Sequence, residues 1–152
     1  MKSEPDVFSF DDLLAAKGKR SAWDGVRNYQ ARNLMRSMKK GDRALFYHSN
    51  AKPPGVAGVC EVVREAYPDG TQFDPEDAHF DPRSDPAQPR WSMVDVRALA
   101  TLEKFVSLDQ LKGDPRLADM AVVRRGSRLS VQPVTAAEWR VVLTLGGLAG
   151  RF

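Results

Sequence analysis

A helix with one apolar side is predicted over residues 28–38. Its apolar side chains repeat at positions i, i+3, i+4 and i+7, and they are Ala31, Leu34, Met35 and Met38. Arg32 and Arg36 lie away from this stripe. We therefore expect the helix to pack on the core with one side and to present a basic surface with the other.

Two further helices are predicted from their first turns. Ser9 and Asp12 have the spacing of a capping box, in which each side chain bonds the backbone N–H of the other residue, so a helix is expected over residues 10–17. Thr135 and Glu138 repeat this pattern and begin a helix that we expect to end near Gly146.

Strands are predicted where β-branched and aromatic residues partly alternate with polar ones, over residues 43–49, 56–65 and 91–102, with a shorter strand over 129–134. The segment 69–89 is rich in acids and proline and indicates a long loop, a kind of loop that often carries function. Mixed, mostly antiparallel strands with peripheral helices indicate an α+β domain, expected to form a small curled barrel.

Composition limits the class of protein. The chain has 152 residues, 42% apolar and 28% charged, which fits one domain over residues 1–152. No apolar run approaches the roughly 20 residues that cross a bilayer, and the first residues lack the apolar stretch of a signal peptide. We expect a cytoplasmic monomer without membrane contact. The single cysteine, Cys60, excludes an internal disulfide, and two histidines are too few for an ordinary zinc site.

The net charge is only +3, but charge is sorted along the chain. Residues 17–43 hold nine basic and two acidic side chains, residues 61–95 hold nine acidic and three basic ones, and residues 104–152 hold eight basic and four acidic ones. This sorting fits a basic face that attracts nucleic acid, with an acidic loop elsewhere. It fits equally well a solvated surface that has no partner.

Motifs of common catalytic sites are absent. The chain has no Gly-x-Ser-x-Gly, no phosphate-binding loop and no dinucleotide fingerprint. His48 and Ser49 are neighbours in a predicted strand and point to opposite faces, so they cannot act as a base and a nucleophile. The segment 74–81 holds carboxylates and an imidazole but lacks the glycine and glutamate of a calcium loop. We expect no catalytic residue, no metal and no cofactor.

The strongest local signal lies in residues 23–33, where an aromatic ring, planar amides and cations meet at a predicted helix start. A helix N-terminus favours phosphate, and an aromatic ring beside it can stack on a base, which is worth about 1–3 kcal/mol. Trp91, Tyr47 and His48 belong to other strands, and a pocket walled by several rings is geometrically allowed. Trp23 and Trp91 can equally be core residues.

Motifs along nearly the whole chain resemble the EVE domain family. In order they are Met1-Lys2-Ser3-Glu4-Pro5, Trp23–Asn33, Phe46–Asn50, Gly55–Gly58, Ala66–Asp69, Trp91–Val96 and Arg128–Val134. The resemblance implies a PUA-like barrel, related to the YTH readers of methylated adenine in RNA. It also implies a role in binding modified bases, chiefly modified cytosine in DNA. Family members usually carry a Tyr-Trp-Leu-like stretch before Met-Lys-Ser-Glu-Pro, so we expect either a short first strand here or residues missing before Met1.

The same resemblance implies site residues. Those matched by motif near the cavity are Ser3, Trp23, Arg27, Asn28, Tyr47, His48 and Trp91. The two tryptophans are expected to stack on a base taken out of its helix, while Asn28, Ser3 and His48 read its edge. Phosphates, which set affinity but not base identity, are expected on Arg27, Arg32, Arg36, Lys39 and Lys40. Whether His48 donates or accepts depends on its protonation and is left open.

The leading hypothesis is a non-catalytic reader of a modified base in nucleic acid. Two alternatives are an RNA-binding accessory module of the PUA-like kind and an enzyme of nucleic-acid modification or restriction that uses the same pocket. The loop 69–89 is expected to form a lid or rim, either away from the basic helix or at the edge of the pocket, because its carboxylates repel phosphate.

Overall fold

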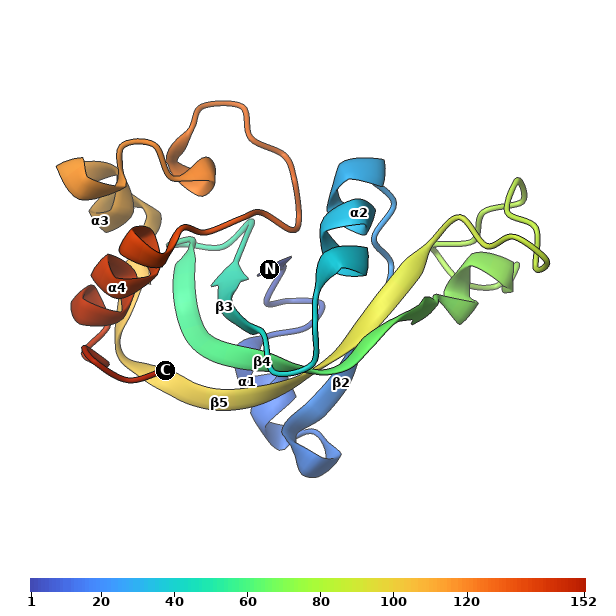
Figure 1. Cartoon of the computed structure of the whole chain (residues 1–152), viewed down its shortest axis with the longest axis horizontal. Coiled ribbons are helices and arrows are strands. Elements are labelled where there is room, and N and C mark those ends of the chain that lie inside the picture. Colours follow the sequence, from blue (N-terminus) through green and yellow to red (C-terminus); the bar gives the residue numbers. More distant parts are fainter.

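The computed structural model describes residues 1–152 and has five strands in one strongly curved sheet (Figure 1). The strand order is β1–β3–β4–β5–β2, with β1 Lys2–Ser3, β2 Arg20–Trp23, β3 Arg43–His48, β4 Gly55–Pro68 and β5 Ser92–Ser107. β1 and β3 are parallel, and all other neighbours are antiparallel. The expected α+β class is confirmed, and the first strand is two residues long. The sheet curls but stays open, because its edge strands β1 and β2 do not pair with each other.

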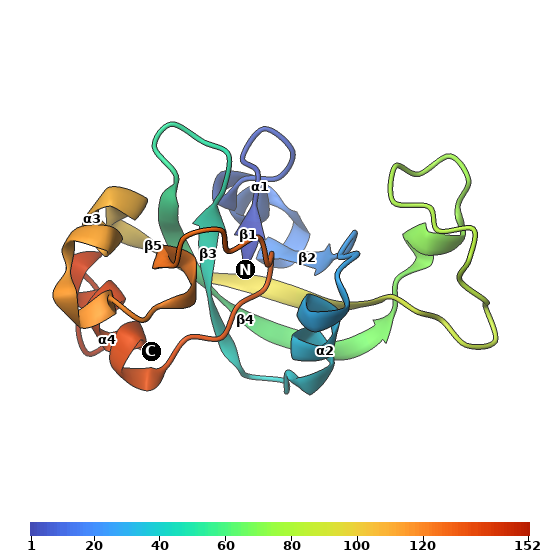
Figure 2. The same ribbon diagram turned by 90° about the horizontal axis from the view of Figure 1, so that it is seen from above.

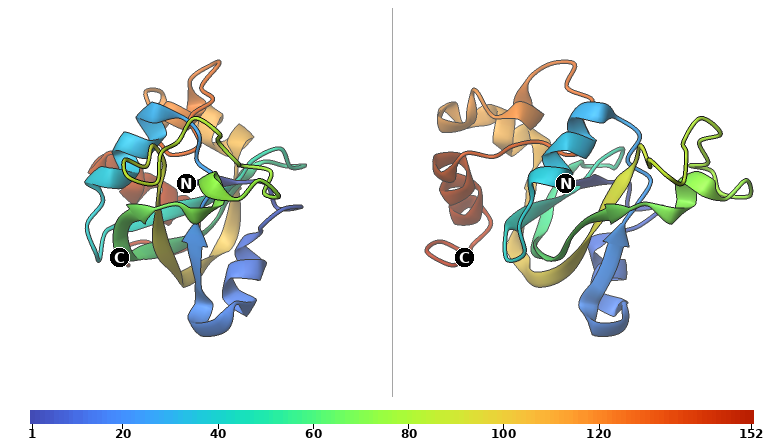
Figure 3. Two further views of the ribbon diagram at one scale, coloured as in Figure 1. Left: turned by 90° about the vertical axis from the view of Figure 1, so that its right-hand side faces the viewer. Right: turned by 45° about the vertical axis from the view of Figure 1, so that its right-hand side comes forward.

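Four α-helices surround the sheet: α1 (Phe10–Ala15), α2 (Tyr29–Ser37), α3 (Leu108–Gly113) and α4 (Ala136–Leu145). Short 3₁₀ turns lie at Lys17–Lys19, Gly70–Phe73, Pro115–Leu117 and Ala121–Val123. α1 and α2 both bury side chains in one core cluster, and α3 and α4 gather at one end of the sheet (Figures 1 and 2). At the other end, the long loop between β4 and β5 projects from the body of the protein (Figure 3).

The helices begin where side chains close to them in sequence cap their free N–H groups. Ser9 Oγ accepts from Asp12 N at 3.0 Å, and Asp12 Oδ2 accepts from Ser9 N at 2.8 Å, which is the predicted capping box of α1. Thr135 and Glu138 make the same reciprocal pair at α4. α2 is capped by Asn28, whose Oδ1 accepts from Ala31 N at 3.0 Å.

Two strand assignments differ from the sequence prediction. The sequence does not predict β2, because its four residues are mostly polar or small and only Trp23 is buried. The strand predicted over 129–134 is wrong. These residues are irregular, with Ser130 O accepting from Lys2 N at 2.8 Å and Val131 buried in the core. Burial of one apolar residue, rather than a strand ladder, explains the apolar pattern there.

β3 divides the core in two. Phe46 packs in a cluster with residues of α1 and α2, whereas its neighbours Leu45 and Tyr47 pack in a second cluster with residues of α3 and α4. Successive side chains of a strand point to opposite faces, so this division follows from the backbone. Tyr47 therefore faces away from Phe46 and from the cluster that contains Trp23.

Candidate nucleic-acid interface

Asp69 is the buried centre of the contact between the loop 69–91 and the turn before α2. Its Oδ1 accepts from the backbone N and the hydroxyl of Thr71, at 2.8 and 2.6 Å. Its Oδ2 accepts from Gly25 N at 2.8 Å and from Arg27 Nη1 at 3.1 Å. Burial favours a raised pKa, but these hydrogen bonds outweigh it and hold the pKa of Asp69 below its ordinary value. An ionised carboxylate thus ties the loop to the turn.

Arg27 uses most of its donors inside the protein. Besides the bond to Asp69, Nε donates to His79 O at 2.9 Å, Nη1 to Val26 O at 3.0 Å and Nη2 to Thr71 Oγ1 at 3.0 Å. A guanidinium has five N–H groups, so little donor capacity is left for a phosphate or a base. The geometry explains why this position holds an arginine without invoking a ligand.

Trp91 is buried in the same joint between the loop and α2. Its Nε1 donates to Asp81 Oδ2 at 2.7 Å, and its backbone N donates to Gln72 Oε1 at 3.1 Å. Its ring stacks on Tyr29 with centroids 4.9 Å apart, and the Arg27 guanidinium lies 5.6 Å from its centroid. The polar and aromatic surfaces of Trp91 are thus engaged in holding the loop.

The acidity of the loop has a structural origin. Each of its aspartates accepts, through Oδ1, a hydrogen bond from the backbone N of the second residue after it, and these are Asp69, Asp74, Asp77, Asp81 and Asp85. Such Asx turns let a side chain replace the backbone partner that a strand or helix would supply. The carboxylates therefore shape the loop, and no group of three or more His, Cys, Asp or Glu side chains is placed to hold a metal ion.

Trp23 belongs to a different aromatic group from Trp91, and no ring contact joins the two tryptophans. The Trp23 ring meets Phe46 edge-on, with centroids 5.4 Å apart, and Phe46 also contacts Phe10 and His48. Trp23 is 7% exposed. Its indole N–H has no partner in the protein and is not among fully buried polar atoms, so solvent reaches it. Trp23 is therefore a core residue with one open donor.

The structure answers the question about His48. Its Nε2 accepts from Phe10 N at 3.0 Å, which requires a lone pair on Nε2 and places the proton on Nδ1. Burial lowers the pKa of His48 from its ordinary value, and the charge of Asp11 opposes this only in part. His48 is therefore neutral and offers one N–H donor to a neighbouring group.

His48 should also make stability depend on pH. The pKa of His48 in the folded protein lies below the ordinary value of 6.5. Its contribution to the free energy of unfolding is therefore complete above pH 6.5 and is lost as the pH falls from 6.5 through the folded pKa. In His48→Gln, an amide oxygen can accept from Phe10 N without titrating. We expect the parent to lose more unfolding free energy than the variant between about pH 7.5 and about pH 5, measured by urea denaturation.

The Met1 amino group, whose burial lowers its pKa to about 6, titrates in the same range. It is common to both proteins, so their difference isolates His48. An equal loss of stability in the parent and in His48→Gln would contradict the assignment of a neutral, partly buried His48.

The three remaining expected site residues are placed apart. Ser3 Oγ donates to Phe8 O at 2.5 Å. Asn28 is exposed and caps α2 with its oxygen, which leaves its amide N–H groups free. Tyr47 lies on the other face of β3, where Lys2 Nζ is 5.9 Å from its ring centroid. Of these three, Asn28 alone combines free donors with the Trp23 side of β3.

The four cations expected to bind phosphate fall into two kinds. Arg32 and Arg36 on α2 both bond the neutral backbone oxygen of Arg90 in the loop 69–91, and Arg36 also bonds Ser92 at the start of β5. Lys39 and Lys40 are exposed beyond the end of α2, and their ammonium groups form no hydrogen bond or ion pair. All four therefore keep an uncompensated positive charge.

The sequence motifs did not predict a second positive surface. A groove of about 610 Å³ is lined by 13 residues without a single acid, and its cations are Lys2, Lys112, Arg124 and Arg125. Tyr47 and Asn50 also line it. The signal in the sequence was the basic excess over residues 104–152, which gave no indication that the 122–127 segment faces β1 and β3.

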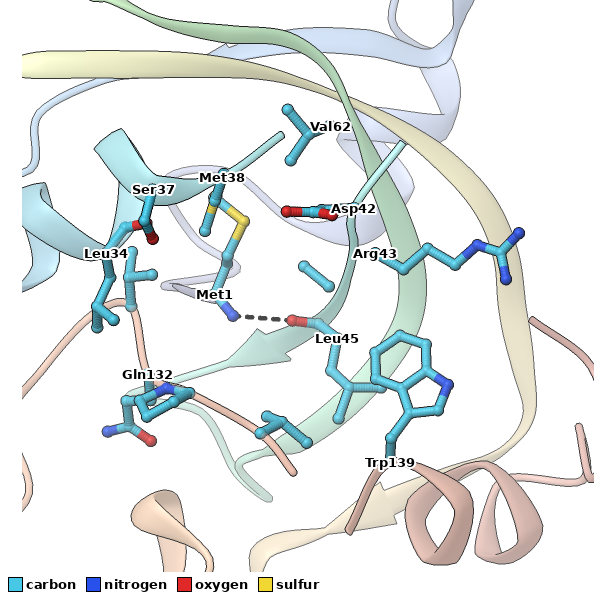
Figure 4. Close-up of a pocket in the computed structure, with 14 residues that line it drawn as sticks. Met1, Leu34, Ser37, Met38, Asp42, Arg43, Leu45, Val62, Gln132 and Trp139 are labelled. Atoms are coloured by element: carbon cyan, nitrogen blue, oxygen red, sulfur yellow. Dashed lines mark hydrogen bonds between the residues drawn. The ribbon is translucent and has the colours of Figure 1, made fainter. Parts of the chain in front are cut away.

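A third hollow, between α2, β3 and residues 131–134, is mostly apolar (Figure 4). Its volume is about 370 Å³, and Met38 and Trp139 are among the side chains that line it. The Met1 amino group donates to Leu45 O at 2.9 Å on its wall. None of the residues expected near a base lines this hollow.

The comparison with known families decides what this fold is. A family model described as "EVE domain" matches residues 1–145. The chain belongs to the EVE domain family. The resemblance drawn from the sequence motifs is thereby confirmed.

Solved relatives share the whole EVE fold. The DUF55 domain of human thymocyte nuclear protein 1 superposes with a TM-score of 0.90 at 48% identity, covering 97% of each chain. A Pseudomonas syringae protein gives 0.92 at 44% identity, covering 96% of this chain and 97% of its own. A crystal structure of human THYN1 in complex with 5-methylcytosine-containing DNA gives 0.90 at 46% identity, covering 96% of this chain and 95% of that one.

The names of relatives correct one expectation about this EVE domain. Thymocyte nuclear protein 1 of Danio rerio is 48% identical over 163 residues, covering 95% of this chain and 70% of that protein, and the Homo sapiens protein of the same name is 46% identical, covering 95% and 72%. Both are named as nuclear proteins, which overturns the predicted cytoplasmic location. None of the helices of this EVE domain has the length and apolar character needed to cross a bilayer.

Proposed function

We propose that this EVE domain binds DNA that carries a modified cytosine and does not act on it as an enzyme. The observation that carries the proposal is the relative solved with 5-methylcytosine-containing DNA, human THYN1, at 46% identity over nearly the whole chain. The identity and the TM-score of 0.90 show that the two chains share one backbone fold, which supports the proposal.

The charge of the surface supports the proposal. The cations on and after α2, and those around the groove lined by Lys2 and Arg124, form no ion pair within the protein. Phosphate contacts by such cations supply affinity that does not depend on sequence, and base contacts supply discrimination. The assignment of Arg32, Arg36, Lys39 and Lys40 to the nucleic-acid backbone is part of this proposal.

For the base itself we propose the Trp23 side of β3. Three donors are free there: the indole N–H of Trp23, the amide N–H groups of Asn28 and the Nδ1–H of His48. The exposed edge of a cytosine carries acceptors that such donors can bond. Base contacts remain predictions for the other four expected residues. The polar groups or rings of Ser3, Arg27 and Trp91 are engaged within the protein, and Tyr47 lies on the other face of β3.

Binding is tested by fluorescence anisotropy with a labelled oligonucleotide that contains 5-methylcytosine or cytosine at one position. We expect tighter binding of the methylated form, and DNA bound more tightly than RNA of the same sequence. Each oligonucleotide is also incubated with the protein, with and without magnesium, and its mass is then measured by mass spectrometry. A changed mass would overturn the non-catalytic assignment, and equal affinity for both bases would overturn the reader assignment.

Replacing Trp23 with phenylalanine should reduce the preference for the modified base. The smaller ring keeps an aromatic side chain in the core but removes the open N–H, and one net hydrogen bond is worth about 1 kcal/mol, or roughly fivefold in Kd. The affinity for the unmodified oligonucleotide, which is bound mainly through its phosphates, should fall less. Trp139→Phe, the same change on α4, is the control and should keep the parent's preference. A Trp23→Phe protein that keeps it too would exclude Trp23 from the base site.

A further inference from the structure

A hollow lined by four arginines lies between α2 and the last part of the loop. Its volume is about 350 Å³, and its charged residues are Arg32, Arg36, Arg83, Arg90 and Asp85. Arg32 and Arg36 are one helical turn apart on α2, and the other three come from a segment about 50 residues later. The loop therefore adds cations to the basic helix, although its overall composition is acidic.

The helix arginines are held in place without being neutralised. Arg36 Nε donates to Ser92 Oγ at 3.0 Å, and Arg32 Nη1 donates to Arg90 O at 3.0 Å. These acceptors are uncharged, so both guanidinium groups keep their full charge. Burial and the neighbouring charge of Arg32 lower the pKa of Arg36, in agreement with a site that has an excess of positive charge.

The loop arginines form no direct polar contact that holds the loop, although the charge of Arg90 contributes to the lowered pKa of Asp81. The guanidinium groups of Arg83 and Arg90 form no hydrogen bond and no ion pair, and neither lies over an aromatic ring. Asp85, the single acid of the hollow, uses Oδ1 to accept from Ala87 N at 2.9 Å and pairs with none of the four. Four positive groups around one small hollow repel each other unless an anion joins them.

We propose that this hollow binds a phosphate of the nucleic-acid backbone, with Arg83 and Arg90 completing the site begun by Arg32 and Arg36. The planar guanidinium fork matches the paired oxygens of a phosphodiester, and charge-assisted hydrogen bonds of this kind are short and strong. The inference rests on the proposed function and adds to it a fixed phosphate contact supplied by the loop. This contact sets the register of the strand relative to α2.

The test is the double variant Arg83→Ala with Arg90→Ala, because both side chains can be removed without loss of a hydrogen bond or an ion pair. We expect it to weaken the binding of methylated and unmethylated duplexes alike, by about tenfold. The slope of log K against log salt should become shallower by about 0.9, the value for one lost phosphate contact on duplex DNA. The control, Lys17→Ala with Lys104→Ala, removes equal charge from two exposed lysines and should keep the parent's slope. An Arg83/Arg90 variant that matches this control overturns the proposal and leaves the proposed function standing.

A second measurement separates the site from the function. Inorganic phosphate is titrated into the ¹⁵N-labelled protein while the arginine Nε–H signals are followed by NMR. Shifts of the Arg83 and Arg90 signals at millimolar phosphate, absent for arginines outside the hollow, support the site even if no oligonucleotide binds. If these signals do not move while the parent binds DNA, the phosphate of the complex lies elsewhere and the proposal fails.

Discussion

Replacing Asp69 with alanine is expected to lower the free energy of unfolding by about 3–5 kcal/mol, because it breaks a buried ion pair from one side. The change leaves the N–H of Gly25 and the guanidinium of Arg27, 21% exposed, without their common acceptor. It also removes Oδ1, the common acceptor of the backbone N and the hydroxyl of Thr71, so the loop is no longer bonded to the turn before α2. Chemical denaturation followed by circular dichroism measures the loss.

Asp119→Ala provides the comparison, since this aspartate is exposed and forms no hydrogen bond or ion pair. Its effect should stay within about 0.5 kcal/mol. If the two variants unfold at the same denaturant concentration, Asp69 does not anchor the loop in solution. If Asp69→Ala releases the loop while the rest of the protein stays packed, the fluorescence of Trp91, which the loop buries, should change first.

Trp23→Ala is expected to cost about 3–5 kcal/mol of stability, the range for truncating a core tryptophan. Trp23 is 7% exposed and ends β2, an edge strand whose sole partner is β5. Removing its ring leaves Phe46 without its edge-on contact at 5.4 Å and opens a cavity beneath α2. This structural cost is the reason why the role of Trp23 in base recognition is tested with phenylalanine.

Trp139→Ala makes the same truncation on α4, where the side chain is half-buried and its Nε1 donates to Phe152 O at 3.3 Å. We expect a clearly smaller loss there, because less apolar surface leaves the core. Equal losses in thermal or urea unfolding would show that Trp23 is not the centre of the packing around Phe46.

Local features were readable from the sequence. The capping boxes of α1 and α4 each involve residues three apart, so the spacing of Ser9 and Asp12, or of Thr135 and Glu138, predicts the geometry directly. The apolar stripe of α2 likewise predicts the buried side, where Ala31 and Met35 are fully enclosed. In each case the determining contacts lie within one or two turns of chain.

Contacts between distant segments were not readable in the same way. Arg27 reads in the sequence as a cation beside an aromatic residue, yet its partner is Asp69, 42 residues away. Trp23 and Trp91 were expected to line one pocket. In the structure Trp23 packs on Phe46 of β3 and Trp91 stacks on Tyr29 of α2, so the two rings belong to separate aromatic groups. The arginine hollow depends on where the 83–90 segment lies, and no spacing along the chain encodes that position.

The Asx turns of the loop have a consequence for how this protein can vary. Asparagine also accepts through its side-chain oxygen, so Asp74, Asp77 and Asp85 can each become asparagine while the turn that each one makes is kept. Asp81 is the exception, because its second oxygen also receives the indole N–H of Trp91. Shape and charge are therefore separable in this loop: the three changes together raise the net charge of residues 69–91 from −4 to −1 without rebuilding the fold, and a less negative field around the arginines favours DNA binding.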